Sequence, residues 1–175
     1  MLGSYSPPEC WNFRPFFTIQ PVKPTKDKQL KLWKDIILEY HMQNNVCTMN
    51  VATCPLFENK TIDRRLSIDG IKEIIDHLIA SENAAWEDSA HTIARVMWKT
   101  PDTIAAEVYN WACQNDYLNT IFTVFELHSG DEHTDSGFHG TDSFLFVKSM
   151  EKLAADGKCV IIPGDTRDED GVKFI

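Results

Sequence analysis

The order of predicted elements repeats along the chain. An amphipathic helix, a short β-prone piece, a helical turn, a second helix and two strands follow one another in the first half, and the same order recurs in the second. The β-prone pieces at Thr48 and Thr123 lie 75 residues apart, and the capping residues Ser67 and Thr141 lie 74 apart. This regularity predicts a structural duplication, in which the chain folds as two small units.

The first half contains two helices with apolar residues at helical spacing. Thr25 is the expected N-cap of the first helix, which ends near Asn44, and Ser67 opens the second. Between them we expect a β-prone piece at 47–51 and a polar helical turn around 59–65; a hairpin of 84–87 and 93–99 follows. The expected core faces are Leu30, Trp33, Ile37 and Tyr40 in the first helix, and Ile68, Ile71, Ile75, Leu78 and Ile79 in the second.

The second half begins with Thr100 and Pro101, which supply an N-cap and a proline for the first helical turn. Residues 120–127 give a β-prone piece that continues into a helical turn. Thr141 is the expected N-cap of the last helix, and Gly157 ends it. Two strands at 159–162 and 172–175 complete the chain. The expected core residues of these two helices are Ile104, Val108 and Trp111, then Phe146, Met150 and Leu153.

Each half therefore has the order of a winged helix, which is a helix-turn-helix with an added β-hairpin. The expected fold class is α+β, with two tandem winged-helix domains at 25–100 and 101–175. A unit of about 75 residues has a small core, so packing of the two units against each other would stabilise both.

The N-terminal segment 1–24 has a different character. Residues 5–24 contain five prolines and five aromatic residues without helical or strand periodicity, which predicts an extended arm. The aromatic rings are costly to leave in water, at about 25 cal/mol per Å² of apolar surface, so they should dock onto a protein surface. That surface is either a partner or the first domain itself.

Charge argues against nucleic acid. Seventeen basic and twenty-six acidic residues give a net charge of −9. The helix that a DNA-binding winged helix inserts into the major groove carries −3 at 67–82 and −1 at 141–157, so phosphates would repel it. The lysines at 23–34 and the group Lys60, Arg64 and Arg65 are expected to lie on solvated faces. A winged-helix protein that binds nucleic acid is the alternative interpretation.

The sequence has none of the common catalytic and cofactor motifs. The chain has no GxSxG, GxxxxGK[ST], GxGxxG or HExxH pattern, and its five cysteines show no CxxC spacing. We therefore expect no enzyme activity, no cofactor and no metal, and cysteines that stay reduced in the cytoplasm. His128, His133 and His139 lie in an acidic stretch that could ligate a metal, although their spacing fits no known site and a flexible loop is the favoured interpretation. No signal peptide or membrane span is expected, so any membrane association is peripheral.

Several segments distributed along the chain carry a family resemblance. They are FRPFFTIQP (13–21), KQLKLW (28–33), CPLFEN (54–59), RRLS (64–67), FTVFELHSGDE (122–132), FHG (138–140) and GVKFI (171–175). In this order they resemble the vacuolar protein sorting-associated protein 25 family, the small subunits of the endosomal sorting complex ESCRT-II. The resemblance covers essentially the whole chain.

The resemblance implies two tandem winged-helix domains and a subunit that occurs twice in a Y-shaped complex with two larger subunits. It implies that the arm and first domain dock onto these larger subunits, and that the second winged helix recruits the charged multivesicular body protein of ESCRT-III. The implied role is sorting of ubiquitinated cargo into multivesicular endosomes, by a cytoplasmic protein that reaches endosomal membranes only through its complex.

In this family, proline-aromatic motifs of the arm contact the larger subunits. Carried onto this sequence, the second motif falls on Arg14-Pro15-Phe16-Phe17, with Arg14 in place of the usual first proline. The first falls on Pro7-Pro8-Glu9-Cys10, where no aromatic residue stands at the last place and Trp11 follows one residue later. The expected partner-binding residues are Pro7, Pro8, Trp11, Phe13, Pro15, Phe16 and Phe17.

Overall fold

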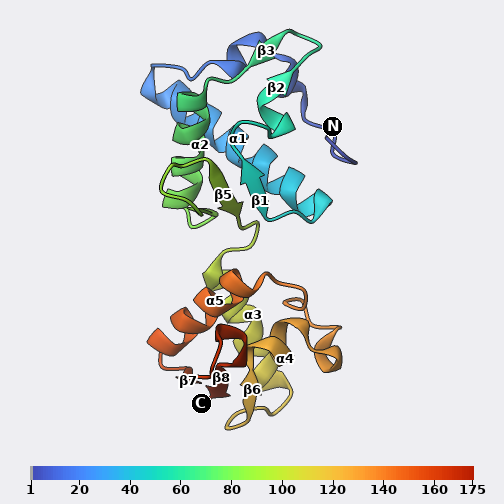
Figure 1. Ribbon diagram of the computed structural model, residues 1–175, viewed down its shortest axis with the longest axis vertical. Helices are drawn as coiled ribbons and strands as arrows, with labels where there is room; N and C mark the ends of the chain where they lie inside the picture. The colour runs from blue at the N-terminus through green and yellow to red at the C-terminus, as the bar shows by residue number, and fades with distance from the viewer. Residues whose placement is uncertain (1) are drawn as a thin grey trace. The chain divides into compact units, whose positions relative to one another are not determined.

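The structure is a computed structural model that describes residues 2–175. The chain divides into two compact units, the first ending at Trp98 and the second running from Lys99 to Ile175. Both mix α-helices with small antiparallel sheets, which confirms the α+β class (Figure 1). Each unit is described on its own.

The first unit contains two long helices and a three-stranded sheet (Figure 1). Its elements are α1 (Lys23–Asn44), β1 (Thr48–Asn50), a 3-10 helix (Pro55–Phe57), β2 (Glu58–Asn59), β3 (Arg64–Arg65), α2 (Ile68–Ala80), β4 (Ala84–Trp86) and β5 (Ile93–Val96). The sheet has the order β1-β5-β4, and β2 and β3 form a separate two-stranded hairpin.

The second unit repeats this plan. Its elements are α3 (Pro101–Gln114), β6 (Ile121–Thr123), α4 (Val124–Ser129), a 3-10 helix (Asp131–His133), α5 (Ser143–Ala155), β7 (Cys159–Ile162), a 3-10 helix (Arg167–Glu169) and β8 (Gly171–Phe174). The sheet order β6-β8-β7 matches that of the first unit, because in both the first strand pairs with the last. Equivalent topology in both units supports the predicted duplication.

Helix ends follow local capping chemistry. The Ser67 and Thr100 side chains accept hydrogen bonds from the backbone N–H groups of Gly70 and Thr103, as expected of N-caps. Two predicted caps were wrong. Helix α1 begins at Lys23, before Thr25, because Pro24 in its first turn has no N–H to leave unbonded. Asp142, not Thr141, caps α5, by accepting a hydrogen bond from the Leu145 N–H.

One predicted helical turn and one predicted core residue were also wrong. Residues 58–65 form the β2–β3 hairpin, and the helical turn of this unit lies earlier, at Pro55–Phe57. Ile68 is 44% exposed because it stands at the first position of α2, where its side chain does not face α1. Ile71, Ile75 and Leu78, one to three turns later on the same helix, are fully buried.

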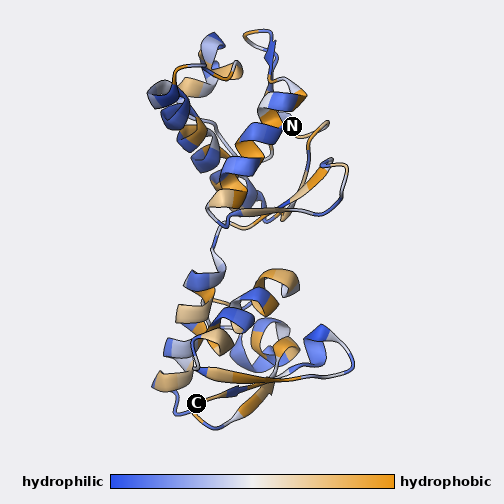
Figure 2. Ribbon diagram, turned by 90° about the vertical axis from the view of Figure 1, so that its left-hand side faces the viewer, coloured by the Kyte–Doolittle hydropathy of each residue, from blue (hydrophilic) through white to orange (hydrophobic). Residues whose placement is uncertain are grey.

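Each unit has its own apolar core. In the second, α3 and α5 pack against each other and bury Ile104, Val108, Phe146, Met150 and Leu153 against the inner face of the sheet. Hydrophobic residues follow the strands of this sheet and one side of its helices (Figure 2). Every buried side-chain nitrogen and oxygen atom among residues 2–175 has a hydrogen-bond partner, so neither core contains an unpaired polar side chain.

A matched pair of substitutions on α2 tests this assignment. Ile75→Ala opens a cavity at a fully buried position and should lower the free energy of unfolding by about 2–5 kcal/mol. Ile68→Ala, on the same helix, should change it by less than about 0.5 kcal/mol because that side chain is already exposed. Urea denaturation followed by tryptophan fluorescence measures both. Equal losses for the two variants would contradict the assigned helix faces.

Candidate functional site

The candidate site is the N-terminal segment of the first unit, where all the sequence-predicted partner residues lie. The segment is not extended throughout. It contains two 3-10 helices, Glu9–Asn12 and Arg14–Phe17, closed by backbone hydrogen bonds such as Phe16 N–H to the Phe13 carbonyl at 2.9 Å. Prolines permit this because their fixed φ suits the first positions of a helical turn, where an N–H is not needed.

The rings of Phe16 and Phe17 lie in the core of the first unit. They are 6% and 3% exposed, and both contact Trp33 of α1. Phe16 stacks on the Trp33 ring with centroids 4.5 Å apart and 14° between planes, whereas Phe17 meets it edge-on at 5.5 Å. The surface that buries these two rings therefore belongs to the chain itself.

Polar side chains of α1 hold the backbone of the segment in place. The buried Gln29 amide donates to the carbonyls of Phe16 and Thr18, both at 2.9 Å, and its oxygen accepts the Gln20 N–H at 3.0 Å. Trp33 Nε1 donates to the same Phe16 carbonyl at 3.2 Å. These bonds satisfy backbone groups that the irregular segment could not pair internally.

The earlier part of the segment is attached to the 3-10 helix Pro55–Phe57 and to the β2–β3 hairpin. Trp11 Nε1 donates to the Leu56 carbonyl at 2.8 Å, and the Asn59 amide donates to the Trp11 carbonyl at 2.9 Å. Asn59 is only 1% exposed, yet it also donates to Asn12 Oδ1 at 3.1 Å. Sequence reasoning missed Gln29 and Asn59. Their only sequence signal is a polar residue next to apolar core positions, as Gln29 is next to Leu30.

Other residues of the segment face solvent. Phe13 is 63% exposed, the highest value among the exposed large hydrophobic residues of the described chain. Pro8 and Pro15 are also exposed, whereas Pro7 and Trp11 are half-buried. The chain therefore presents one phenylalanine ring and two proline rings on a segment whose neighbours are anchored in the core.

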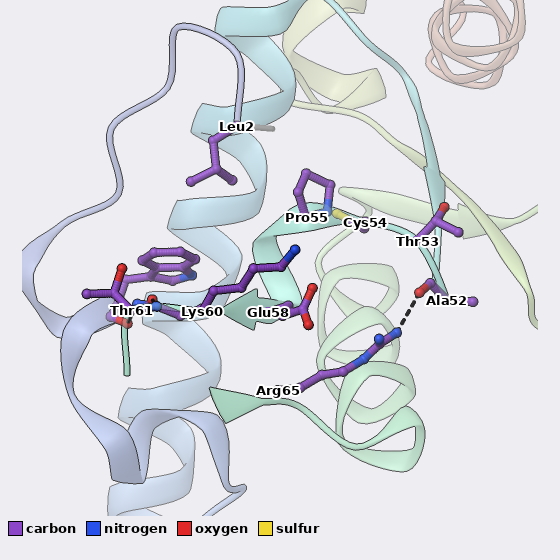
Figure 3. Close-up of a pocket in the computed structure, with 11 residues that line it drawn as sticks. Leu2, Ala52, Thr53, Cys54, Pro55, Glu58, Lys60, Thr61 and Arg65 are labelled. Carbon is purple, nitrogen blue, oxygen red and sulfur yellow. Dashed lines mark hydrogen bonds between the residues drawn. The ribbon is translucent and has the colours of Figure 1, made fainter. Parts of the chain in front are cut away.

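A hollow of about 600 Å³ lies beside this segment and includes Trp11 in its wall (Figure 3). Leu2, residues 52–55 and the β2–β3 hairpin form the rest of the wall. Burial raises the pKa of the Cys54 thiol in this wall to about 11. The thiol is accordingly protonated at neutral pH, which makes it a poor nucleophile.

The three histidines of the acidic stretch do not converge. His128 is buried and pairs with Ser129 Oγ at 2.6 Å and Asp168 Oδ1 at 3.3 Å, whereas His139 bonds to the Gly130 carbonyl at 3.1 Å. His133 packs on the Trp111 ring, with centroids 4.8 Å apart. Within residues 2–175, no group of three or more histidine, cysteine or acidic side chains has the geometry of a metal site.

Fold and site together define the class: a tandem winged-helix protein that carries an anchored, proline- and aromatic-rich segment with exposed rings. In the described chain, residues 2–175, no helix combines the length and the apolar composition that crossing a bilayer requires. The described cysteines are all free thiols.

Comparison with known proteins assigns the family. Residues 10–142 match the model of the family described as ESCRT-II complex subunit, and the chain belongs to this family. It is 37% identical over 170 residues to vacuolar protein-sorting-associated protein 25 of Xenopus laevis, covering 95% of this chain and 97% of the relative. Identity to the human protein of the same name is 31% over 177 residues, covering 99% of both.

Solved structures agree with the fold. A crystal structure of subunit VPS25 of the endosomal trafficking complex ESCRT-II superimposes with a TM-score of 0.80 at 24% identity, covering 96% of this chain and 98% of that one. The chain also superimposes on a chain from a crystal structure of the endosomal complex ESCRT-II (VPS22/VPS25/VPS36). The TM-score is 0.75 at 25% identity, covering 96% of this chain and 98% of the matched one. The expected family and its tandem winged-helix fold are thereby confirmed.

Replacing the buried glutamine tests the anchoring of the segment. Gln29→Leu removes the hydrogen bonds that Gln29 makes to the carbonyls of Phe16 and Thr18 and to the Gln20 N–H. Trp33 Nε1 and Gln20 Nε2 still donate to the two carbonyls, so the Gln20 N–H is the group left without its partner, and the change should lower the free energy of unfolding by about 1–3 kcal/mol. Chemical denaturation measures the loss, and limited proteolysis should cut within residues 9–20 sooner.

The matched control is Gln43→Leu, the same change at an exposed position of the same helix. It should leave both the unfolding free energy and the cleavage rate close to the wild-type values. If Gln29→Leu behaved like this control, the hydrogen bonds to Gln29 would not hold the segment.

Proposed function

We propose that this protein is a non-catalytic subunit of an ESCRT-II complex and that it docks onto the two larger subunits through its N-terminal segment and first unit. The observation that carries this proposal is the family match over most of the chain together with near-full-length relatives. A solved complex of similar fold contains VPS22 and VPS36 beside VPS25, which supports the choice of partners.

The exposed part of the segment is the proposed contact. Phe13 is flanked by buried anchors, because Trp11 is bonded to Leu56 and Phe16 lies in the core. A ring held in this way loses little conformational entropy when a partner covers it, so most of its burial energy is retained as affinity. Pro7, Pro8 and Pro15 add stiff apolar surface beside it. Trp11 contributes through its half-buried face, and Phe16 and Phe17 contribute indirectly by fixing the backbone.

The second unit is proposed to recruit the charged multivesicular body protein of ESCRT-III. Support comes from the family, and from a unit that folds around its own core. In this proposal the protein acts in the cytoplasm, is peripheral at endosomal membranes through its complex, and serves the sorting of ubiquitinated cargo into multivesicular endosomes. No cofactor or metal takes part.

Charge disfavours the alternative of nucleic-acid binding. Helix α2 occupies the position of a recognition helix and presents Asp69, Glu73 and Asp76 against the single Lys72. Phosphate contacts supply most of non-specific affinity, so this helix would be repelled before base contacts formed. Absence of a gel shift with duplex DNA at low salt would agree with the proposal, and a salt-sensitive shift would favour the alternative.

Phe13→Ala tests the proposed contact directly. If the ring is a central anchor, the change should weaken assembly with the larger subunits by about 2 kcal/mol or more, measured by titration calorimetry. Thermal unfolding of the free protein should stay unchanged because the ring is exposed. Phe125→Ala in α4, which removes a ring that is 53% exposed in the second unit, is the control and should assemble normally.

An assembly constant unaffected by Phe13→Ala would place the ring outside the contact and sink this part of the proposal. Deleting the whole segment is a poorer test, because it also removes the core rings Phe16 and Phe17.

Truncation tests the different roles proposed for the two units. A chain that ends at Trp98 should still join the larger subunits but fail to retain the ESCRT-III protein in a pull-down. Full-length protein carried through the same purification is the reference. Retention of the ESCRT-III protein by the truncated complex would show that the second unit is dispensable for recruitment.

A further inference from the structure

The hollow of the first unit has two chemically different halves. Leu2, Trp11 and Pro55 contribute apolar surface to its wall. Glu58, Lys60 and Arg65 contribute charged groups, which Figure 3 shows below Leu2 and Pro55. Its volume of about 600 Å³ lies within the range of about 300–1,000 Å³ typical of ligand-binding pockets. In the view of Figure 3 the Lys60 ammonium is drawn between Pro55 and Glu58, and Lys60 is one of the residues that line the hollow.

The basic residues of this hollow are positioned by neutral partners. Arg65 Nη2 donates to the Ala52 carbonyl at 2.6 Å, and Arg64 Nη1 donates to the Asp63 carbonyl at 2.8 Å. Within residues 2–175, neither arginine nor Lys60 forms an ion pair with a carboxylate. Their charges are therefore held in place without being neutralised, and a planar guanidinium fixed by one bond keeps further N–H groups for a ligand.

A second hollow of about 160 Å³ continues the first one. It shares Lys60 and Arg65 with the larger hollow and adds Arg64. The three cations thus surround adjoining spaces on the same hairpin, β2–β3 and its turn. A chain that extends from one hollow into the other would meet all three.

The charge of the molecule is unevenly distributed. Residues 99–175 carry 14 acidic and 6 basic residues, whereas residues 1–98 carry 12 and 11. The net charge is therefore −8 for residues 99–175 and −1 for residues 1–98. The first unit is close to neutral and does not repel an anion in general. At the hairpin the three cations outnumber the two carboxylates Glu58 and Asp63, so this region attracts a negatively charged ligand.

We propose that this hollow binds an acidic peptide segment of a partner protein. An apolar side chain of the segment would pack against Trp11 and Pro55, while its carboxylates would meet Lys60 and the guanidinium of Arg65. Arginine clusters recognise acidic motifs in this way, because a guanidinium can bond a carboxylate through two parallel N–H groups.

Glu58 and Asp63 favour a peptide over a phosphate polymer. Both carboxylates stand among the cations and would repel a ligand whose contacting surface is negative throughout, such as the phosphate backbone of a nucleic acid or an anionic membrane surface. A peptide alternates acidic side chains with backbone N–H groups, which can donate to Glu58 while the side chains reach the cations. The two proposed contacts share Trp11 but differ in Phe13 and in the cations, so substitutions of Lys60 and Arg65 test the hollow without changing Phe13.

Fluorescence anisotropy with a short labelled peptide that alternates leucine and glutamate tests the proposal on the full-length protein. Wild-type protein should bind it, and the double variant Lys60→Glu, Arg65→Glu should bind at least about tenfold more weakly, because reversing two charges turns attraction into repulsion. Lys60→Glu alone should already weaken binding, and its side chain makes no hydrogen bond to lose. Circular dichroism verifies that each variant folds.

The matched control reverses two charges elsewhere in the first unit. Lys28→Glu, Lys31→Glu changes exposed lysines of α1, outside the hollow, and should bind within about threefold of wild type. Equal losses in both double variants would overturn the proposal in favour of general charge attraction. No binding by wild type would overturn it as well. So would tighter, Lys60-dependent binding to duplex DNA or to vesicles of phosphatidylserine and phosphatidylcholine.

Discussion

The contact on which the first unit depends is the stack of Phe16 on Trp33. Trp33 is fully buried in α1, and its indole N–H bonds the carbonyl of the residue that its ring covers. One side chain of the helix thereby fixes both the ring and the backbone of a segment that has no regular secondary structure of its own beyond two short turns. The core of this small unit is consequently completed by residues that precede its first helix, which a unit of this size needs.

The core of the second unit is also completed by a residue outside its helices and strands, but from a different part of the chain. Phe138, from the loop before α5, is 1% exposed and packs on the rings of Trp111 and Phe146. Phe138 thus anchors the loop in the core, although most other residues of the loop are exposed. The two units share one topology but complete their cores with different segments. The first uses the N-terminal segment before α1, and the second uses the loop before α5.

Much of the fold follows from residue patterns. The helical spacing of apolar residues predicted α2 and α5. The N-cap of α2, Ser67, was also predicted correctly, because capping is a local interaction of a hydroxyl side chain with the following turn. Asp142 was missed because Thr141 beside it has equal capping chemistry and only the backbone conformation selects between them. For Phe16 and Phe17 the pattern required burial without specifying the surface, since that surface is formed by residues distant in sequence.

The anchored segment changes how assembly should be understood. A free arm would lose conformational entropy when it becomes ordered on binding. A segment that is already bonded to Gln29 and Trp33 has lost this entropy during folding. The most direct measurement is hydrogen exchange of the free protein, at the amides of Trp11, Phe13, Phe16 and Gln20, which donate hydrogen bonds here. Protection of these amides before any partner is added is the predicted result. Exchange at the rate of an unstructured peptide, with protection only after assembly, would contradict it.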